Sequence, residues 1–254
     1  MHSQLCDGPF VYRLGRKIFI LERAVRFRYG LLRSSNLKMV GTAFFSIHNM
    51  IRNLLFDLGG VIMDIRRQDC VDAFERLGLK NADSYFGLYG QEGTFGEIES
   101  GAIDVNEFHR RLHTLLRPDV TDSQIDDAFN RFLIGIPAHR LASLRELRQR
   151  GFRIYLLSNT NPIMWNSRIK EEFTKEGLTR EDYFDGMVVS FEAGSLKPDA
   201  SIFRHTESTL GIIPGETLFF DDSQANADAA RALGFEAVCV VPGTEFTDYI
   251  KDLK

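Results

Sequence analysis

The chain has 254 residues, of which 44% are hydrophobic and 26% are charged, which is ordinary for a soluble globular protein with one domain and an insertion, or two small domains. No stretch approaches the roughly 20 apolar residues that a spanning helix needs, so no membrane partner is expected. Residues 1–49 carry a net charge of +6 and the remainder −10. An acidic body argues against a nucleic-acid partner, which would require a basic face.

Residues 1–49 are rich in arginine and poor in acidic residues, as transit peptides and basic anchors can be. A second interpretation is that they precede the true start of the protein, because Met50 comes directly before the first apolar strand. We favour the second interpretation and treat residues 1–49 as an N-terminal extension that need not belong to the native fold. The three cysteines are too few and too scattered for a disulfide framework, so we expect a cytoplasmic location.

Five short apolar runs, each followed by a turn or helix signal, predict buried strands at residues 52–57, 153–157, 186–190, 217–221 and 236–241. Their apolar residues do not alternate with polar ones, which indicates strands that are buried on both faces of a parallel sheet. Helical patterns lie between them at residues 138–150, 162–176, 199–210 and 225–233. The alternation of strand and helix predicts an α/β fold with a doubly wound, Rossmann-like parallel sheet.

About 95 residues separate the first predicted strand from the second, far more than one crossover helix needs. This gap contains helical patterns at residues 68–77, 105–116 and 123–133. We therefore predict an inserted helical cap at residues 66–136 and a core domain made of residues 50–65 and 137–254. Such a cap would cover the carboxyl ends of the strands, where open parallel sheets bind ligands. The turn-rich segment at residues 90–101 is the part of the cap that we expect to face the site.

Four polar clusters follow four of the predicted strands. In the first, Asp57 ends a buried strand and is followed by Gly59 and Gly60, which let the backbone come close to a ligand. In the second, Ser158 and Asn159 begin a segment of hydroxyl and amide groups that opens a helix and can bind phosphate. Each cluster also has a purely structural interpretation, a tight turn for the first and a helix N-cap for the second.

The third and fourth clusters carry charge. Lys197 precedes a proline-started helix, where it is either an exposed surface residue or a point charge that neutralises a phosphate. Asp221 and Asp222 follow an apolar strand, and such neighbouring carboxylates repel each other unless a cation lies between them. Hard oxygen ligands of this kind suit Mg²⁺, whereas a solvated acidic turn is the structural alternative.

The order Asp, Ser, Lys, Asp-Asp, with each cluster at the tip of its own strand, resembles the four motifs of the haloacid dehalogenase-like hydrolase superfamily. The segments FDLGGVI, LLSNTNP, SLKPD and FFDDSQANADAARALGF are similar to the branch that includes bacterial glucose-1-phosphate phosphatases and the N-terminal phosphatase domain of soluble epoxide hydrolases. The resemblance covers the chain from about residue 52 to its end. That branch carries a helical cap between its first and second motifs, which the spacing here predicts independently.

The resemblance implies a Mg²⁺-dependent phosphatase that forms an aspartyl-phosphate. Asp57 would be the catalytic nucleophile and a metal ligand, and the backbone carbonyl of Gly59 would be a second ligand. Asp222 would hold the metal directly, with Asp221 beside it as a ligand or as a partner of the ligands. Catalysis would then come mainly from positioning and charge stabilisation.

The resemblance also implies a phosphate-binding group and a substrate class. Ser158 and the backbone amide of Asn159 would bind the transferring phosphoryl group, and Lys197 would bridge that group and the nucleophile during catalysis. The expected partner is a small phosphorylated metabolite, with a sugar phosphate favoured. The sequence predicts no oligomeric state.

One departure from the family pattern lies at Gly59. Family phosphatases usually have a second aspartate there as general acid for the leaving group, and loss of such a group typically costs about 10²–10⁴-fold in rate. The loss matters less when the leaving oxygen bears negative charge well, which favours a sugar 1-phosphate. Asp64 of the core, or Glu97 and Glu99 of the cap, are candidates to replace the missing acid.

Three other functions are compatible with the fold. A metal-free haloacid dehalogenase would also lack the second aspartate, but it has no use for the pair Asp221 and Asp222. A phosphomutase or another phosphotransferase needs the residue that Gly59 replaces. A non-catalytic binding protein would have no reason to retain all four clusters. A phosphatase is the interpretation that accounts for the whole set.

Overall fold

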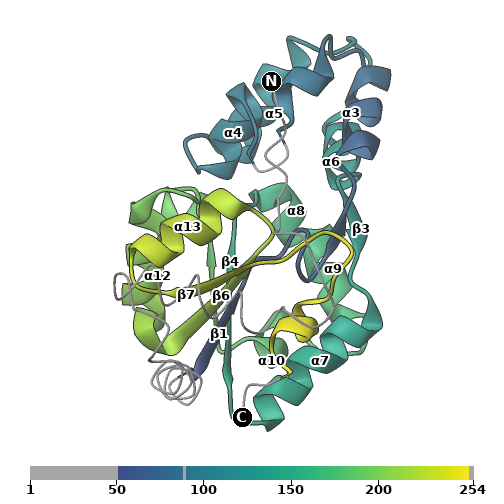
Figure 1. The fold of residues 1–254 in the computed structure, drawn as a ribbon. Coiled ribbons are helices and arrows are strands. Elements are labelled where there is room, and N and C mark those ends of the chain that lie inside the picture. The colour runs from purple at the N-terminus through teal and green to yellow at the C-terminus, as the bar shows by residue number, and fades with distance from the viewer. Residues whose placement is uncertain (1–50, 88–89, 252–254) are drawn as a thin grey trace, which may run out of the picture.

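The protein is represented by a computed structural model, of which residues 51–87 and 90–251 are described, so the extension predicted at residues 1–49 lies outside the described residues. Its centre is a five-stranded sheet in the order β5-β4-β1-β6-β7 in which every neighbouring pair is parallel (Figure 1). All five predicted strands are confirmed. In chain order they are β1 (Asn53–Phe56), β4 (Arg153–Ser158), β5 (Gly186–Val189), β6 (Thr217–Asp221) and β7 (Glu236–Cys239).

The middle strand β1 is buried at every position because apolar side chains leave it on both faces. Leu54 and Phe56 belong to one hydrophobic cluster, and Leu55 belongs to a second cluster on the opposite face. The ring of Phe56 stacks on that of Phe220 in β6, with the two centroids 4.8 Å apart. Strands buried on both faces account for the apolar runs without alternation in the sequence.

Helices cover both faces of the sheet, as expected for a doubly wound fold (Figure 1). Phe203 of α12 (Ala200–Leu210) and Ala230 of α13 (Gln224–Ala232) pack in the cluster of Leu55. The opposite face is covered by α7 (Ala138–Gln149), α9 (Arg168–Thr174) and α10 (Arg180–Tyr183). The helices predicted at residues 138–150, 199–210 and 225–233 are therefore confirmed.

The single helix predicted at residues 162–176 is wrong, because the chain breaks there into α8 (Pro162–Asn166) and α9. Ser167, at the break, has non-helical backbone angles (φ −113°, ψ −98°). Its hydroxyl donates to the carbonyl of Ile163 at 2.6 Å and lies 3.0 Å from the amide nitrogen of Asn130. A serine that bonds backbone and a neighbouring helix in this way competes with the helical ladder, and the break lets α8 and α9 pack in different directions.

The remaining helices lie above the carboxyl edge of the sheet (Figure 1). They are α3 (Arg67–Arg76), the 3₁₀-helix η2 (Ala82–Tyr85), α4 (Gly93–Glu99), α5 (Val105–His113) and α6 (Asp122–Asn130). The three predicted cap helices are confirmed, but α5 and α6 each end three residues earlier than predicted. Helix α4 was not predicted, because its glycines indicate a turn. The domain boundaries at residues 65/66 and 136/137 stay a prediction.

The cap has an apolar interior of its own. Five phenylalanine rings from its helices and the residue after η2 form a cluster with centroids 4.5–6.2 Å apart, namely Phe74, Phe86, Phe95, Phe108 and Phe129. Phe95 lies on α4 and contacts the other four. Burial of this ring outweighs the weak helix propensity of the glycines around it, so the turn-rich segment folds as a helix.

The chain enters and leaves the cap through a two-stranded antiparallel ribbon of β2 (Asp64–Ile65) and β3 (Leu133–Gly135). Arg140 of α7 holds the base of this ribbon. Its guanidinium donates to Asp64 Oδ1 at 2.8 Å and to the carbonyl of Ile62 at 3.2 Å. It also donates twice to the carboxylate of Glu245, at 2.7 and 3.0 Å. The ribbon is thus tied to the core by a nearly buried cation.

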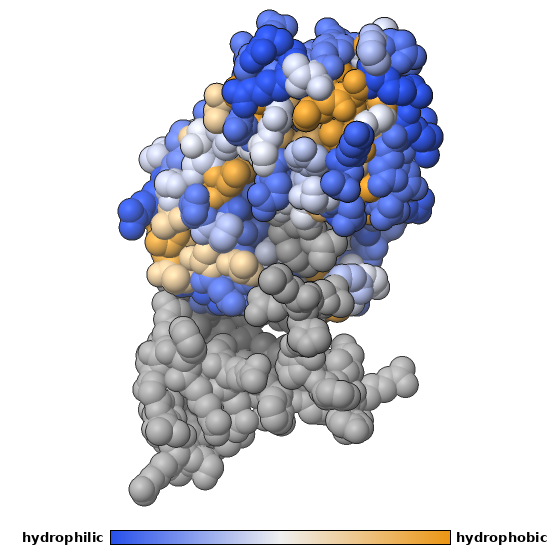
Figure 2. Space-filling model, turned by 90° about the horizontal axis from the view of Figure 1, so that it is seen from above, coloured by the Kyte–Doolittle hydropathy of each residue, from blue (hydrophilic) through white to orange (hydrophobic). Residues whose placement is uncertain are grey.

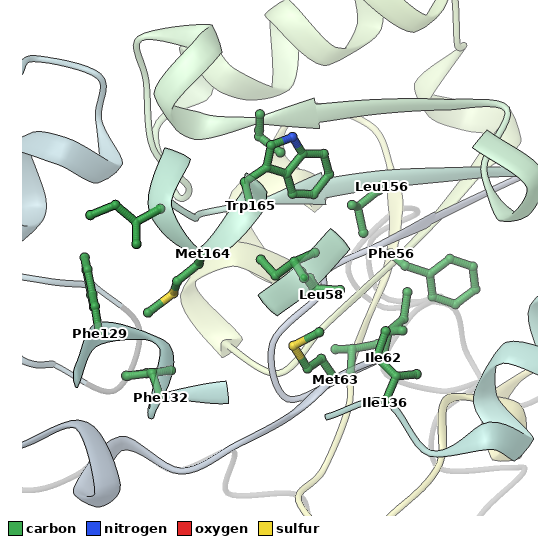
Figure 3. Packing of buried hydrophobic residues seen from close by; sticks show 14 of the residues in the cluster. Phe56, Leu58, Ile62, Met63, Phe129, Phe132, Ile136, Leu156, Met164 and Trp165 are labelled. Carbon is green, nitrogen blue, oxygen red and sulfur yellow. The ribbon is translucent and has the colours of Figure 1, made fainter. Parts of the chain in front are cut away.

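Apolar contacts join the cap to the core beside this ribbon. Figure 3 shows Met164 of α8 extending toward Phe129 and Phe132 of the cap, whereas Trp165 points toward the sheet. Helices α6 and α8 pack against each other at this place. The junction therefore places α8, which follows the second polar cluster, directly under the cap.

The surface of the described residues is mainly polar. The face in Figure 2 is largely hydrophilic, with its hydrophobic residues in small patches. The large apolar side chains that are exposed, Leu115, Ile134, Ile213 and Val241, come from separate parts of the chain. Within the described part of the chain, no helix has the length and apolarity to cross a membrane.

Candidate active site

A cavity of about 80 Å³ lies where β1, β4 and β6 end, beneath the cap. The core lines it with residues from all four polar clusters, including Asp57, Gly59, Ser158, Asn159, Lys197 and Asp222. The cap lines it with Gln91, Glu99, Phe132 and Leu133. The structure therefore brings the predicted clusters together at the sheet edge that the fold class implies.

Lys197 is at the centre of the charged groups and is only 3% exposed. Its Nζ lies 2.7 Å from Oδ1 of Asp57 and 2.8 Å from Oδ2 of Asp221, and it donates to the carbonyl of Leu157 at 3.0 Å. Burial alone would lower the pKa of Lys197, but the charges of Asp221 and Asp57 outweigh burial and raise it. The interpretation of Lys197 as a solvated surface residue is therefore wrong.

The carboxylates around this lysine carry more negative charge than it can neutralise. Burial, opposed by Lys197 and reinforced by Asp221, raises the pKa of Asp57 to about 6. Burial and the charges of Asp57 and Asp221 raise the pKa of Asp222 to about 8. Oxygen atoms of Asp57, Asp221 and Asp222 all lie within 4.8 Å of one another. A cation placed among them would favour the ionised forms.

Asp221 is already engaged by the protein. Besides Lys197, it accepts hydrogen bonds on Oδ1 from the backbone N–H of Ser223 at 2.8 Å and from the amide of Asn226 at 2.9 Å. These contacts fix the loop after β6 and, with it, the position of Asp222. Gly60 has φ +73°, and a Cβ there would lie 2.2 Å from Oδ2 of Asp222. The second glycine after Asp57 therefore makes room for this carboxylate.

The loop after β4 contains both a residue that lines the cavity and a helix N-cap, which are the two interpretations of its sequence. Ser158, 2% exposed, lines the cavity. The side chain of Asn159 donates to the carbonyl of Lys197 at 3.0 Å and accepts from its N–H at 2.9 Å, so it fixes the backbone of the lysine. Asn161 caps α8 by accepting from the N–H of Met164 at 3.0 Å. The N-cap role thus falls to Asn161, which leaves Ser158 toward the cavity.

A family model described as haloacid dehalogenase-like hydrolase matches residues 51–234, more than half of the chain. The chain belongs to the haloacid dehalogenase-like hydrolases. The family that the four motifs predict is confirmed, and so is its α/β fold with a parallel central sheet.

This haloacid dehalogenase-like hydrolase is 38% identical over 187 residues to the D-ribitol-5-phosphate phosphatase of Bacteroides thetaiotaomicron, which covers 74% of this chain and 90% of that protein. A HAD family enzyme of the same organism, solved with magnesium and inorganic phosphate, matches with a TM-score of 0.73 and 37% identity over 78% of this chain and 98% of that one. A HAD-like hydrolase structure from Porphyromonas gingivalis matches with a TM-score of 0.74 and 33% identity, over 80% of this chain and 98% of that one.

The three candidate replacement acids of this haloacid dehalogenase-like hydrolase lie in different surroundings. Asp64 pairs with Arg140, Glu97 pairs with Arg111, and neither lines the cavity. Glu99 does line the cavity, is 5% exposed, and has its pKa raised to about 8 by burial. The structure therefore separates Glu99 from the other two candidates.

Two polar cavity residues were predicted only as members of a segment and were not singled out. Gln91 lines the cavity from the loop before α4, and Thr160 lines it from the loop after β4. Both belong to segments that were predicted to face the site, but neither carries a charge or a strand-end position that would single it out. Their role depends on the path of the backbone, which the sequence pattern does not specify.

Proposed function

We propose that this hydrolase is a Mg²⁺-dependent phosphatase that hydrolyses small sugar or polyol phosphates through an aspartyl-phosphate on Asp57. The observation that carries the proposal is the contact between Asp57 and the buried Lys197, beside a group of carboxylate oxygens from Asp57, Asp221 and Asp222 that lie within 4.8 Å of one another. Two comparisons support it, one with a protein named as a D-ribitol-5-phosphate phosphatase and one with a structure solved with magnesium and inorganic phosphate.

The residues present fit a magnesium ion. Magnesium prefers oxygen ligands. The clustered carboxylates of Asp57 and Asp222 have raised pKa values, and a cation bound between them would lower those pKa values. We assign Asp57, Asp222 and the backbone carbonyl of Gly59 as its ligands. Asp221 already accepts three hydrogen bonds from the protein, so we assign it to hold Lys197 and the loop beside the metal. When bound, the ion neutralises charge on the phosphoryl group.

The protein's own groups account for both chemical steps. A carboxylate oxygen of Asp57 attacks phosphorus, the bond to the ester oxygen breaks, and the alkoxide leaves and then takes a proton from solvent water. Ser158, the backbone amide of Asn159 and Lys197 bind and neutralise the phosphoryl oxygens during this transfer. Water then attacks phosphorus, which releases inorganic phosphate and restores Asp57. Its pKa of about 6 leaves Asp57 mainly ionised at neutral pH.

The leaving group narrows the substrate class further. Gly59 supplies no acid, and Asp64 and Glu97 are paired elsewhere, so none of these three residues helps the leaving oxygen to bear negative charge. An anomeric oxygen does this better than a primary alcohol, because the ring oxygen withdraws electrons. Within sugar phosphates we therefore favour a sugar 1-phosphate.

The test is phosphate release from glucose 1-phosphate, glucose 6-phosphate and ribitol 5-phosphate, each with Mg²⁺ and with excess chelator. We expect release from at least one ester with Mg²⁺ and loss of activity in chelator. Absence of release from all of them, and from p-nitrophenyl phosphate, would contradict the proposal. Full activity in chelator would contradict the metal and favour the metal-free chemistry of a dehalogenase.

A further inference from the structure

The cap wall of the cavity holds two polar groups that no described residue satisfies. Oε1 of Gln91 is buried and accepts no hydrogen bond. The carboxyl group of Glu99 is 5% exposed and has neither a hydrogen bond nor an ion pair within the described residues. The rest of this wall, Phe132 and Leu133, is apolar. Buried polar groups are normally hydrogen-bonded, so these two indicate a partner that arrives with the substrate.

Contacts to backbone atoms hold Glu99 beside the cavity, and the side chain of Glu99 takes no part in them. The hydroxyl of Ser190 donates to the carbonyl of Glu99 at 2.7 Å and accepts from the N–H of Thr160 at 3.0 Å. This serine therefore joins the end of α4 to the loop that also carries Ser158. Close docking is also visible at Gly101, where a Cβ would lie 2.2 Å from the carbonyl oxygen of Phe191.

Glu99 lines the cavity from the cap, whereas Asp57, Lys197 and Asp222 line it from the core. Burial raises the pKa of Glu99 to about 8. Because the reacting phosphoryl group is assigned to the core residues, we assign Glu99 to the carbon chain of the esterified alcohol.

We infer that Glu99 and Gln91 bind hydroxyl groups of the esterified alcohol and make the enzyme selective for polyhydroxylated phosphates over alkyl phosphates of equal length. The inference rests on the phosphatase function proposed above. A protonated carboxyl both donates and accepts hydrogen bonds, and the amide oxygen of Gln91 accepts one, which together match neighbouring hydroxyls. The uncharged form of Glu99 also adds no repulsion toward a phosphate dianion.

An alcohol without hydroxyls would leave Oε1 of Gln91 buried and unpaired, and the carboxyl group of Glu99 in the cavity without a partner. Sites built to bind a substrate hydroxyl reject analogues that lack it far more strongly than apolar pockets reject an extra methylene, because the site's own polar groups then lose their partners. These two side chains thus predict that the enzyme distinguishes substrates by the hydroxyl groups of the alcohol and not by its size.

The test compares kcat/KM for ribitol 5-phosphate and pentyl phosphate, which share a five-carbon chain. The variants are Glu99→Met, which keeps the volume but removes the polar group, and Glu99→Gln, which retains hydrogen bonding. Glu97→Met is the matched control, because Glu97 lies on the same helix but pairs with Arg111 outside the cavity. Gln91→Leu repeats the comparison at the second residue.

We expect the wild type to prefer ribitol 5-phosphate by at least about tenfold, the effect of one well-made hydrogen bond. Glu99→Met and Gln91→Leu should each lose about tenfold on ribitol 5-phosphate but little on pentyl phosphate, whereas Glu99→Gln and Glu97→Met should keep most of the preference. Equal losses on both esters, or no preference in the wild type, would overturn the inference but leave the phosphatase standing. A wild type that hydrolyses neither these esters nor p-nitrophenyl phosphate would overturn both.

Discussion

Nζ of Lys197 lies 2.7 Å from Oδ1 of Asp57, with both side chains buried at the carboxyl edge of the sheet. The same nitrogen lies 2.8 Å from Asp221. One cation thus neutralises carboxylates from two adjacent strands, and its removal would leave both buried without a counter-charge.

Lys197→Met should therefore destabilise the fold as well as abolish activity. Breaking a buried ion pair by removing one partner typically costs about 3–5 kcal/mol, and urea unfolding with chelator present measures it. The matched control is Lys251→Met, since Lys251 pairs with Asp248 where both side chains are well exposed, and such pairs contribute at most about 1 kcal/mol. A loss no larger than that of the control would contradict the central role of Lys197.

Asp57→Asn should reduce kcat by about 10³-fold or more, because an amide cannot form the aspartyl-phosphate. The fold should survive, since the substitution removes a buried carboxylate whose pKa is raised to about 6. Steady-state phosphate release and circular dichroism check the two parts. Asp64→Asn is the control, as Asp64 pairs with Arg140 outside the cavity. Retention of more than a few per cent of activity by Asp57→Asn would exclude the covalent mechanism.

Asp222→Asn should weaken the binding of Mg²⁺ by at least about tenfold, because it removes a charged ligand. Binding can be read without turnover, since an ion that binds only the folded state raises Tm. We expect Mg²⁺ to raise the Tm of the wild type and to raise that of Asp222→Asn much less. Asp228→Asn, an exposed position on α13, should behave as the wild type. An unchanged response of the Asp222 variant would remove that residue from the metal site.

Gly59→Asp should restore a general acid and narrow the substrate preference. The position accepts a side chain, because the nearest atom to a Cβ there is Cγ2 of Ile65 at an ordinary 3.5 Å. We expect the wild type to hydrolyse glucose 1-phosphate faster than glucose 6-phosphate, each factor of ten corresponding to about 1.4 kcal/mol of barrier. The variant should gain most on the 6-phosphate, and Gly59→Ala should gain on neither. Equal kcat/KM for the two esters in the wild type would refute the leaving-group argument.

Glu99→Gln should make stability less dependent on pH. Burial raises the pKa of Glu99 from 4.5 to about 8, so between these values the folded protein holds a proton that the unfolded chain releases. The contribution of this proton is fully present below pH 4.5 and is lost as pH rises toward 8. Urea unfolding between pH 5 and pH 8 should show a stability difference, variant minus wild type, that grows with pH.

The titratable and charged groups near Glu99 do not change the expected pH dependence of this stability difference. Cys70 lies across from it on α3, and burial and the charge of Glu99 raise the pKa of that thiol, so it stays neutral over the range. Arg67 lies near Cys70. The carboxylates at the metal site titrate equally in both proteins and cancel in the difference. A difference that is flat with pH would show that Glu99 is ionised in the folded protein.

The sequence predicted the sheet and the four clusters well, because apolar strands that are buried on both faces end in polar residues at one edge. It failed where the backbone path depends on distant contacts. Helix α4 forms around Phe95 despite its glycines, and the break at Ser167 depends on a bond to Asn130 of the cap. Gln91 was missed for the same reason, since a neutral side chain acquires its place in the cavity only through the packing of the cap.

The ribbon of β2 and β3, which Arg140 ties to the core, is the point at which one cap could be exchanged for another. The cap has its own phenylalanine interior and leaves the core where it entered, so its replacement disturbs neither the central strand nor the lysine beside it. The residues that we propose to select the substrate and those that we propose to break the ester bond therefore lie on separate stretches of the chain.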